Sequence, residues 1–125
     1  MSNPNFFILY VDQPLASAKF YEGLLGKAPV EAGPTFAMFA LDSGVMLGLW
    51  SKHTVQPAAL AAVGGSEVAF AVPDKETVAS MHAAWVDRSL VIAQQPVDMD
   101  FGYTFVALDP DGHRLRVFAA AHDQG

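Results

Sequence analysis

The sequence predicts an α+β protein built from two copies of one module, each running strand, helix, strand, strand, strand. Two observations predict this order. Phe36–Trp50 and Tyr103–Phe118 both contain Ala-Leu-Asp, then a glycine turn and a second apolar strand. Phe6–Asp12 and Glu67–Val72 are strand-like and each precedes a segment with helical spacing. Such self-similarity indicates an internal repeat. One helix covers one face of each curled mixed sheet, so we expect the other faces to surround a concave cavity.

The first module opens with the strand Phe6–Asp12, which is aromatic and β-branched. A helix follows over Leu15–Leu25, where apolar residues recur at helical spacing. Pro14 suits the first turn of this helix, and Gly26 suits the position after its end. The remaining elements are a short strand at Pro29–Glu31, a strand at Thr35–Leu41, a tight turn at Asp42–Gly44 and a strand at Val45–Trp50.

A polar and then alanine-rich segment, Ser51–Gly65, separates the modules and is predicted to be a linker with one helical turn at Ala58–Val63. In the second module, Asp74 is a plausible N-cap for a helix over Lys75–Arg88. The other elements are strands at Glu67–Val72 and Leu90–Val97, a polar turn at Asp98–Asp100, the hairpin around Asp109–Gly112 and a frayed tail at Ala119–Gly125. We therefore predict a single domain over residues 1–125, with modules at about 5–51 and 66–119 and a linker at 52–65.

Composition narrows the class of function. The chain has 125 residues, 52% of them hydrophobic and 16% charged, which favours one domain with apolar surface hidden in a ligand cavity or a subunit interface. There is no cysteine, so disulfides and thiolate chemistry are excluded. The net charge of −6 argues against nucleic acid. No apolar run is long enough to cross a membrane, and Met1–Pro4 shows no basic leader, so the expected location is the cytoplasm.

Strand parity divides the apolar residues between two faces. The more aliphatic set is predicted to pack under the helices, and the opposite set to line the concave side. That second set mixes large aromatics with glycine and alanine, and it contains one carboxylate and two guanidinium groups. A lined cavity explains this mixture better than a filled core does. Its members include Phe6, Phe36, Met38, Gly48, Trp50, Glu67, Tyr103, Phe105, Arg114 and Arg116.

Three sequence features, in this order, resemble the vicinal-oxygen-chelate superfamily. They are Ser17 with Phe20-Tyr21, then Leu25-Gly26, and the turn Asp109-Pro110-Asp111-Gly112 before the last strand. The superfamily includes glyoxalase I, extradiol dioxygenases, fosfomycin resistance enzymes and bleomycin resistance proteins. The resemblance covers nearly the whole chain and implies the glyoxalase/bleomycin-resistance-like fold of paired βαβββ modules.

Metal-dependent members of this superfamily place His or Glu ligands on the first and last strands of each half. Carried over by register, those positions are Phe6, Gly48, Glu67 and Arg116. Phenylalanine and glycine offer no ligand atom in their side chains, and arginine stays protonated. One carboxylate is not a metal site. We therefore expect no metal, no cofactor and no catalytic residue of the metal-dependent kind.

Within the superfamily, the chain looks most like the phenazine-antibiotic resistance type. The residues that carry this likeness are Gly48–Ser51, and Phe101–Phe105 leading to Asp109–Val117. Such proteins sequester a planar aromatic drug without transforming it. The resemblance also implies a homodimer, commonly with arms or whole halves exchanged between protomers.

The predicted ligand site combines an aromatic slot with a charged pair. Trp50 would be the stacking platform, and Gly48 would leave room for close approach. Arg116 and Glu67 would hold polar groups of the ligand or pair with each other. Taken one at a time, Phe36, Met38, Tyr103 and Phe105 are more typical of a core, and Trp50 could instead be a core or dimer-interface residue. The full set of predicted ligand-binding residues is Trp50, Phe36, Met38, Gly48, Ser51, Tyr103, Phe105, Arg116, Glu67 and Phe6.

These observations favour metal-free binding and sequestration of a planar aromatic small molecule, such as a phenazine antibiotic. Three alternatives stay open. One is a metal-independent lyase or isomerase with Glu67 as general base and Arg116 stabilising negative charge. Another is binding of a cationic drug of the bleomycin kind, which the acidic net charge would suit. The third is a structural or regulatory dimer whose concave face is filled by its own side chains.

Overall fold

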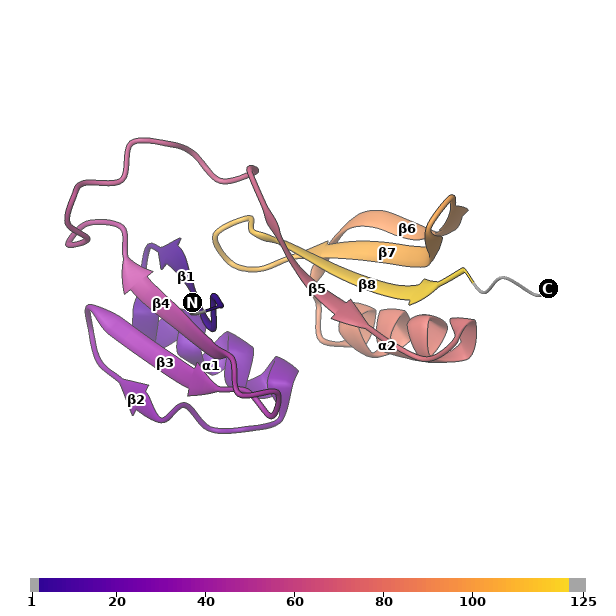
Figure 1. The fold of residues 1–125 in the computed structure, drawn as a ribbon, viewed down its shortest axis with the longest axis horizontal. Helices are drawn as coiled ribbons and strands as arrows, with labels where there is room; N and C mark the ends of the chain where they lie inside the picture. Colours follow the sequence, from indigo (N-terminus) through magenta and orange to yellow (C-terminus); the bar gives the residue numbers. More distant parts are fainter. Residues whose placement is uncertain (1–2, 122–125) are drawn as a thin grey trace. The chain divides into compact units, whose positions relative to one another are not determined.

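The computed structural model describes residues 3–121 and confirms an α+β fold with two copies of the βαβββ order (Figure 1). The described residues form two compact units that divide between Ala61 and Ala62. The first unit contains β1 (Phe6–Val11), α1 (Pro14–Leu25), β2 (Glu31–Ala32), β3 (Phe36–Ala40) and β4 (Met46–Ser51). The second contains β5 (Glu67–Ala71), α2 (Lys75–Asp87), β6 (Val91–Met99), β7 (Gly102–Leu108) and β8 (Arg114–Ala120).

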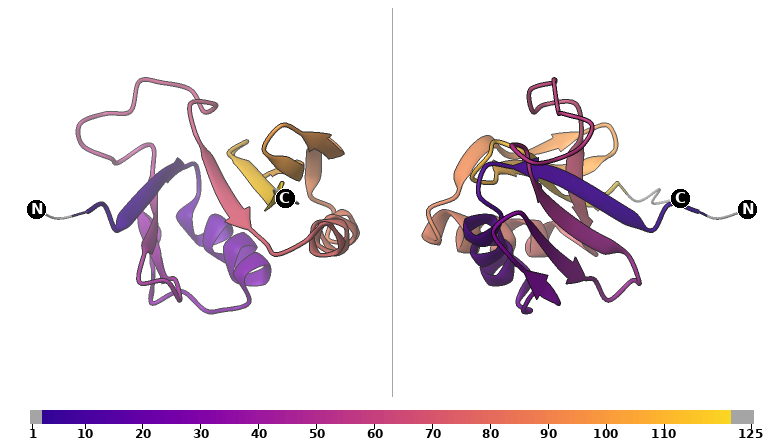
Figure 2. Two further views of the ribbon diagram at one scale, coloured as in Figure 1. Left: turned by 45° about the vertical axis from the view of Figure 1, so that its right-hand side comes forward. Right: turned by 90° about the vertical axis from the view of Figure 1, so that its left-hand side faces the viewer.

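Each unit holds one four-stranded mixed sheet, and the two sheets have the same topology. The strand orders are β1-β4-β3-β2 and β5-β8-β7-β6. In both sheets the first strand pairs in parallel with the last, and the other pairs are antiparallel. One helix lies along one face of each sheet (Figure 2). The duplication predicted from the sequence is therefore present in the backbone.

Local chemistry explains the helix ends. Pro14 is the first residue of α1, and Gly26 closes it in the left-handed conformation, with φ 69°. Asp74 caps α2 as predicted, because its Oδ1 accepts a hydrogen bond of 2.8 Å from the backbone N–H of Thr77.

Several predicted local details differ from the structure, including the short strand predicted at Pro29–Glu31, which is Glu31–Ala32. The turn expected at Asp98–Asp100 is shorter, because Asp98 and Met99 continue β6 and pair with Tyr103 and Gly102. Ala119 and Ala120 belong to β8 rather than to a frayed tail; residues 122–125 lie outside the described part. Residues 58–63 of the linker contain no helical turn.

The core of the first unit lies between α1 and its sheet. Tyr21 of α1, Phe39 of β3 and Leu49 of β4 are fully buried. The register places Phe39 beside Leu47 and Ala37 beside Leu49, so one face of β3 and β4 packs under the helix. The opposite face carries Phe36, Met38, Gly48 and Trp50, as the parity of the sequence predicts.

The core of the second unit is a group of aromatic rings. Phe105 of β7 is fully buried and meets two side chains of α2 edge-on, Trp85 at 5.3 Å and His82 at 5.1 Å between ring centroids. Trp85 in turn meets Phe70 of β5 at 5.6 Å. The Nε2 atom of His82 is buried and has no hydrogen-bond partner among the described residues.

The prediction that Tyr103 and Phe105 line the concave face is therefore wrong. Tyr103 pairs with Ala119, and Phe105 pairs with Val117, so both side chains share the helix-covered face. Ala-Leu-Asp lies at different distances from the two strand ends, because Leu108 ends β7 whereas β3 already ends at Ala40. A slip of one residue moves every side chain of a strand to the other face.

The core position of Phe105 has a measurable consequence. Phe105→Ala should lower the free energy of unfolding by about 3–5 kcal/mol, because it leaves a cavity against Trp85 and His82. Phe101→Ala, the same change at a half-exposed ring in the same unit, should cost less than half as much. Urea unfolding followed by circular dichroism measures both values. Equal losses in the two variants would contradict the core role of Phe105.

Candidate functional site

The sheet face of the first unit that α1 does not cover is aromatic. Phe36 and Trp50 are paired across β3 and β4, and their rings meet edge-to-face at 6.1 Å. Met38 lies opposite Gly48 in the same ladder, and Phe6 of β1 reaches toward the same glycine. We call these five residues the aromatic face. It matches the predicted placement of Phe6, Phe36, Met38, Gly48 and Trp50.

Gly48 lets two rings approach the strand closely. A Cβ atom at this position would lie 3.0 Å from Cζ of Phe36 and 3.0 Å from Cε1 of Phe6, closer than side chains normally pack. The glycine predicted to leave room is therefore covered by two rings of its own unit. Both rings are the ends of rotatable side chains, and Phe6 is 42% exposed. A planar ligand that enters this face would have to displace or stack upon them.

Ser51 is the one predicted site residue of this unit that does not join the aromatic face. It follows Trp50 in β4 and so points to the opposite side of the sheet, where it is buried. Its Oγ accepts a hydrogen bond of 3.2 Å from the backbone N–H of His53, which holds the turn after β4. The ring of His53 reaches back to Asp12 at 2.6 Å and ties this turn to the end of β1.

The matching face of the second unit is polar. The guanidinium of Arg116 forms a two-point ion pair with Glu67, with Nε to Oε1 at 2.8 Å and Nη2 to Oε2 at 3.0 Å. Its Nη1 donates to Oε1 of Gln94 at 3.2 Å and to Oγ1 of Thr104 at 3.1 Å. We call Glu67, Gln94, Thr104 and Arg116 the polar cluster. Each nitrogen of the guanidinium therefore has a partner within the unit.

The ion pair fixes the charge of Glu67. Hydrogen bonds from Arg116 lower the pKa of the Glu67 carboxyl below its usual value, and the positive charges of Arg116 and Arg114 act in the same direction against partial burial. Arg114 lies farther away, with its Nε 3.5 Å from Oε2 of Glu67. Glu67 is thus held as a carboxylate, which makes it a weak proton acceptor at neutral pH.

Sequence reasoning missed three residues of this face: Gln94, Thr104 and Phe101. The ring of Phe101 lies 5.7 Å from the guanidinium carbon of Arg116 and meets Phe118 at 6.0 Å. Thr104 could have been found from the sequence, because aligning Gly44 with Gly112 makes Thr104 the counterpart of Phe36. Gln94 gives no such signal, since the register of β6 against β7 shifts twice around it.

The two units use equivalent positions for different contacts. Phe6 and Gly48 meet on the first and last strands of one sheet, and Glu67 and Arg116 meet on the first and last strands of the other. Neither pair suits a metal ion, because three of the four residues offer no ligand and the carboxylate is already bound by Arg116. Among residues 3–121, no group of three or more His, Asp or Glu side chains is placed to hold a metal.

Comparison with known proteins identifies the family. The model of the glyoxalase/bleomycin resistance protein/dioxygenase superfamily matches residues 3–117. The chain belongs to this superfamily. Members with solved structures share its fold, including a glyoxalase-related enzyme from Fulvimarina pelagi, with 22% identity, a TM-score of 0.82 and coverage of 95% of this chain and 88% of that one.

Two known proteins are similar to this chain along almost their whole length. The phenazine antibiotic resistance protein EhpR of Enterobacter agglomerans is 28% identical over 117 residues, which cover 91% of this chain and 89% of that protein. A protein of Agrobacterium tumefaciens, solved by NMR in solution, is 52% identical with a TM-score of 0.87, over 98% of this chain and all of that one.

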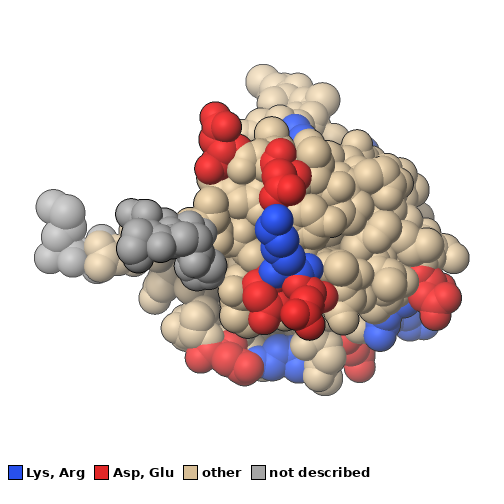
Figure 3. All heavy atoms as spheres, turned by 90° about the vertical axis from the view of Figure 1, so that its right-hand side faces the viewer, with Lys and Arg blue, Asp and Glu red and all other residues tan. Residues whose placement is uncertain are grey.

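The charge of the protein argues against nucleic-acid binding. On the face drawn in Figure 3, acidic and basic side chains lie in small mixed clusters within a wide uncharged surface. The net charge of the sequence is −6. No helix in the described part of the chain is long and apolar enough to cross a membrane.

The ion pair predicts a pH dependence of stability. Because the pKa of Glu67 is lower in the folded state, the pair stabilises the second unit above the unfolded pKa, near 4.5, and this stabilisation is lost as the pH falls through the folded pKa. Glu67→Gln should cost about 1–2 kcal/mol at pH 7 and less at pH 3. Urea midpoints from pH 7 to pH 3 measure this. An equal loss at both pH values would mean that the charge of Glu67 contributes nothing.

Proposed function

We propose that the protein binds and sequesters a planar aromatic small molecule, of the phenazine-antibiotic kind, without a metal and without chemical change. The observation that carries this proposal is the aromatic face, where Trp50 and Phe36 stand edge-to-face beside Gly48. Aromatic side chains in this arrangement can stack on a planar ligand, with a gain of about 1 kcal/mol per ring beyond burial. The similarity to a phenazine antibiotic resistance protein supports the same ligand class.

The polar cluster favours binding over acid–base catalysis. A general base needs a pKa near the working pH, whereas Arg116 lowers the pKa of Glu67. The guanidinium is fixed in one plane by Glu67, Gln94 and Thr104, so it forms a rigid wall beside Phe101. We infer that a planar ligand can also stack on this wall of the second unit.

A homodimer in the cytoplasm is part of the same proposal. β1 is at the edge of its sheet, and Phe6, Phe7, Ile8 and Tyr10 along it are all exposed by 42–54%. An edge strand with exposed aromatic side chains on both faces can pair and pack with a second copy of the chain. The cytoplasm is the compartment in which sequestration keeps a drug from intracellular targets.

Ligand binding is tested by fluorescence. In a Trp85→Phe background, Trp50 is the one remaining tryptophan of the sequence, and phenazine or phenazine-1-carboxylate should quench its emission. Phe6→Ala should weaken binding about ten-fold, because a ring beside Gly48 is lost.

Phe7→Ala is the matched control for this titration. Phe7 is the next residue of β1, points to the other face of the sheet and is also exposed. Its removal should leave the affinity within about two-fold. Absence of quenching by both phenazines in a folded protein would overturn the binding proposal.

The dimer is tested separately by light scattering after size-exclusion chromatography. At micromolar concentration we expect a mass of twice the 13.4 kDa chain. A mass of one chain across the micromolar range would contradict the dimer while leaving the binding proposal to its own test.

A further inference from the structure

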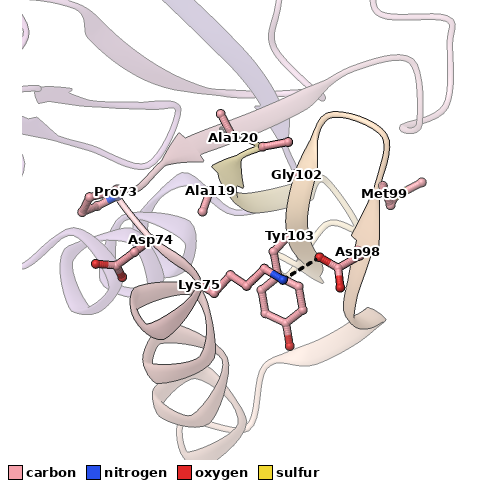
Figure 4. A pocket seen from close by; sticks show the side chains of 10 residues that line it. Pro73, Asp74, Lys75, Asp98, Met99, Gly102, Tyr103, Ala119 and Ala120 are labelled. Atoms are coloured by element: carbon pink, nitrogen blue, oxygen red, sulfur yellow. Dashed lines mark ion pairs between the residues drawn. The ribbon is translucent and has the colours of Figure 1, made fainter. Parts of the chain in front are cut away.

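The second unit contains a cavity that belongs to neither the aromatic face nor the polar cluster (Figure 4). It has a volume of about 460 Å³ and lies where α2 begins and β6, β7 and β8 meet the end of the sheet. This size falls in the range of small-molecule sites. Its wall includes the ring of Tyr103 and the methyl group of Ala119, which pair on the α2 side of the sheet, with Lys75 and Asp98 as charged groups. Met99, Gly102 and Ala120 border the cavity from the strands, but their positions in the ladder face the other side of the sheet.

A cation already lies in this cavity, and it is the ammonium group of Lys75. Its Nζ is 3.0 Å from Oδ1 of Asp98 and 5.3 Å from the centroid of the Tyr103 ring. Figure 4 shows the lysine chain extended from the start of α2 across the ring toward the carboxylate. A carboxylate and an aromatic face are the two partners that an ammonium group prefers.

The local charge favours a cation over an anion. Two carboxylates, Asp74 and Asp98, line the cavity together with one lysine. The positive end of the helix dipole disfavours a lysine in the first turn of α2, so the position of its ammonium depends on Asp98 and Tyr103. The Lys75 side chain is 66% exposed and flexible, so it can leave the cavity without disturbing the core.

We propose that this cavity is a binding site for small primary alkylammonium compounds, with Lys75 as an internal competitor. The ligand's ammonium would replace that of Lys75 between Asp98 and the Tyr103 ring. Its hydrocarbon chain would follow the path of the Lys75 chain across the Tyr103 ring and beside Ala119. The affinity of the site is then set by how readily Lys75 leaves it. This proposal does not depend on the aromatic-ligand site.

Removal of the competitor tests the proposal. n-Butylammonium chloride is titrated into the full-length wild-type protein and into Lys75→Ala, with the amide NMR signals of Asp98 and Tyr103 as the readout. Lys75→Ala should bind at least about ten-fold more tightly than wild type. Asp98→Asn added to Lys75→Ala should reverse that gain, because the ion pair is lost. Both changed side chains are mostly exposed, so the variants should fold.

Two controls distinguish specific binding in this cavity from nonspecific attraction of the ammonium ion to any exposed carboxylate. Lys27→Ala frees Asp42 from a comparable ion pair of 2.7 Å, so n-butylammonium should shift the Asp42 signal far less than that of Asp98 in Lys75→Ala. 1-Butanol, which has the hydrocarbon chain without the charge, should not bind. Equal affinity of wild type and Lys75→Ala, equal shifts at Asp42 and Asp98, or binding of 1-butanol would each overturn the proposal.

Discussion

The hairpin between the last two strands of each unit sets the register of those strands. That register determines which side chains face the helix and which face away from it. Five residues separate the paired ends in both hairpins, Ala40 from Met46 and Leu108 from Arg114, and a glycine with positive φ stands four residues after the end of each first strand. In the second hairpin, Asp109 is buried and accepts hydrogen bonds of 2.9 Å from the N–H groups of Asp111 and His113. This turn fixes Arg116 on the uncovered face and Val117 under α2.

The architecture could be predicted from the sequence because its signals are local and repeated. Each signal depends only on residues that are close in the sequence. These signals are the helix caps at Gly26 and Asp74, the apolar alternation of β1 and β4, and the recurring glycine turns. The first unit's face could be assigned for the same reason, since Phe36, Gly48 and Trp50 follow simple parity on both sides of one turn.

The rest of the candidate site could not be predicted, because it depends on which strands pair and in which register. Ala-Leu-Asp stands at different distances from the ends of β3 and β7, so Tyr103 and Phe105 face α2, whereas Phe36 and Met38 face away from α1. The partners of Arg116 come from three other strands, and the shifted register of β6 hides Gln94 from any count along the chain. Thr104 can be assigned to this face by aligning Gly44 with Gly112. The other contacts depend on the pairing of strands that are far apart in the sequence.

Each unit closes its own core around its own helix, and each contains one tryptophan. Trp85 lies among Phe70 and Phe105 in the second unit, whereas Trp50 lies against Phe36 in the first. Separate cores are the condition under which parts of one chain can lose structure with separate midpoints. The fluorescence of Trp50 therefore reports on the first unit and that of Trp85 on the second. Together they show whether the two units unfold in one transition or in two.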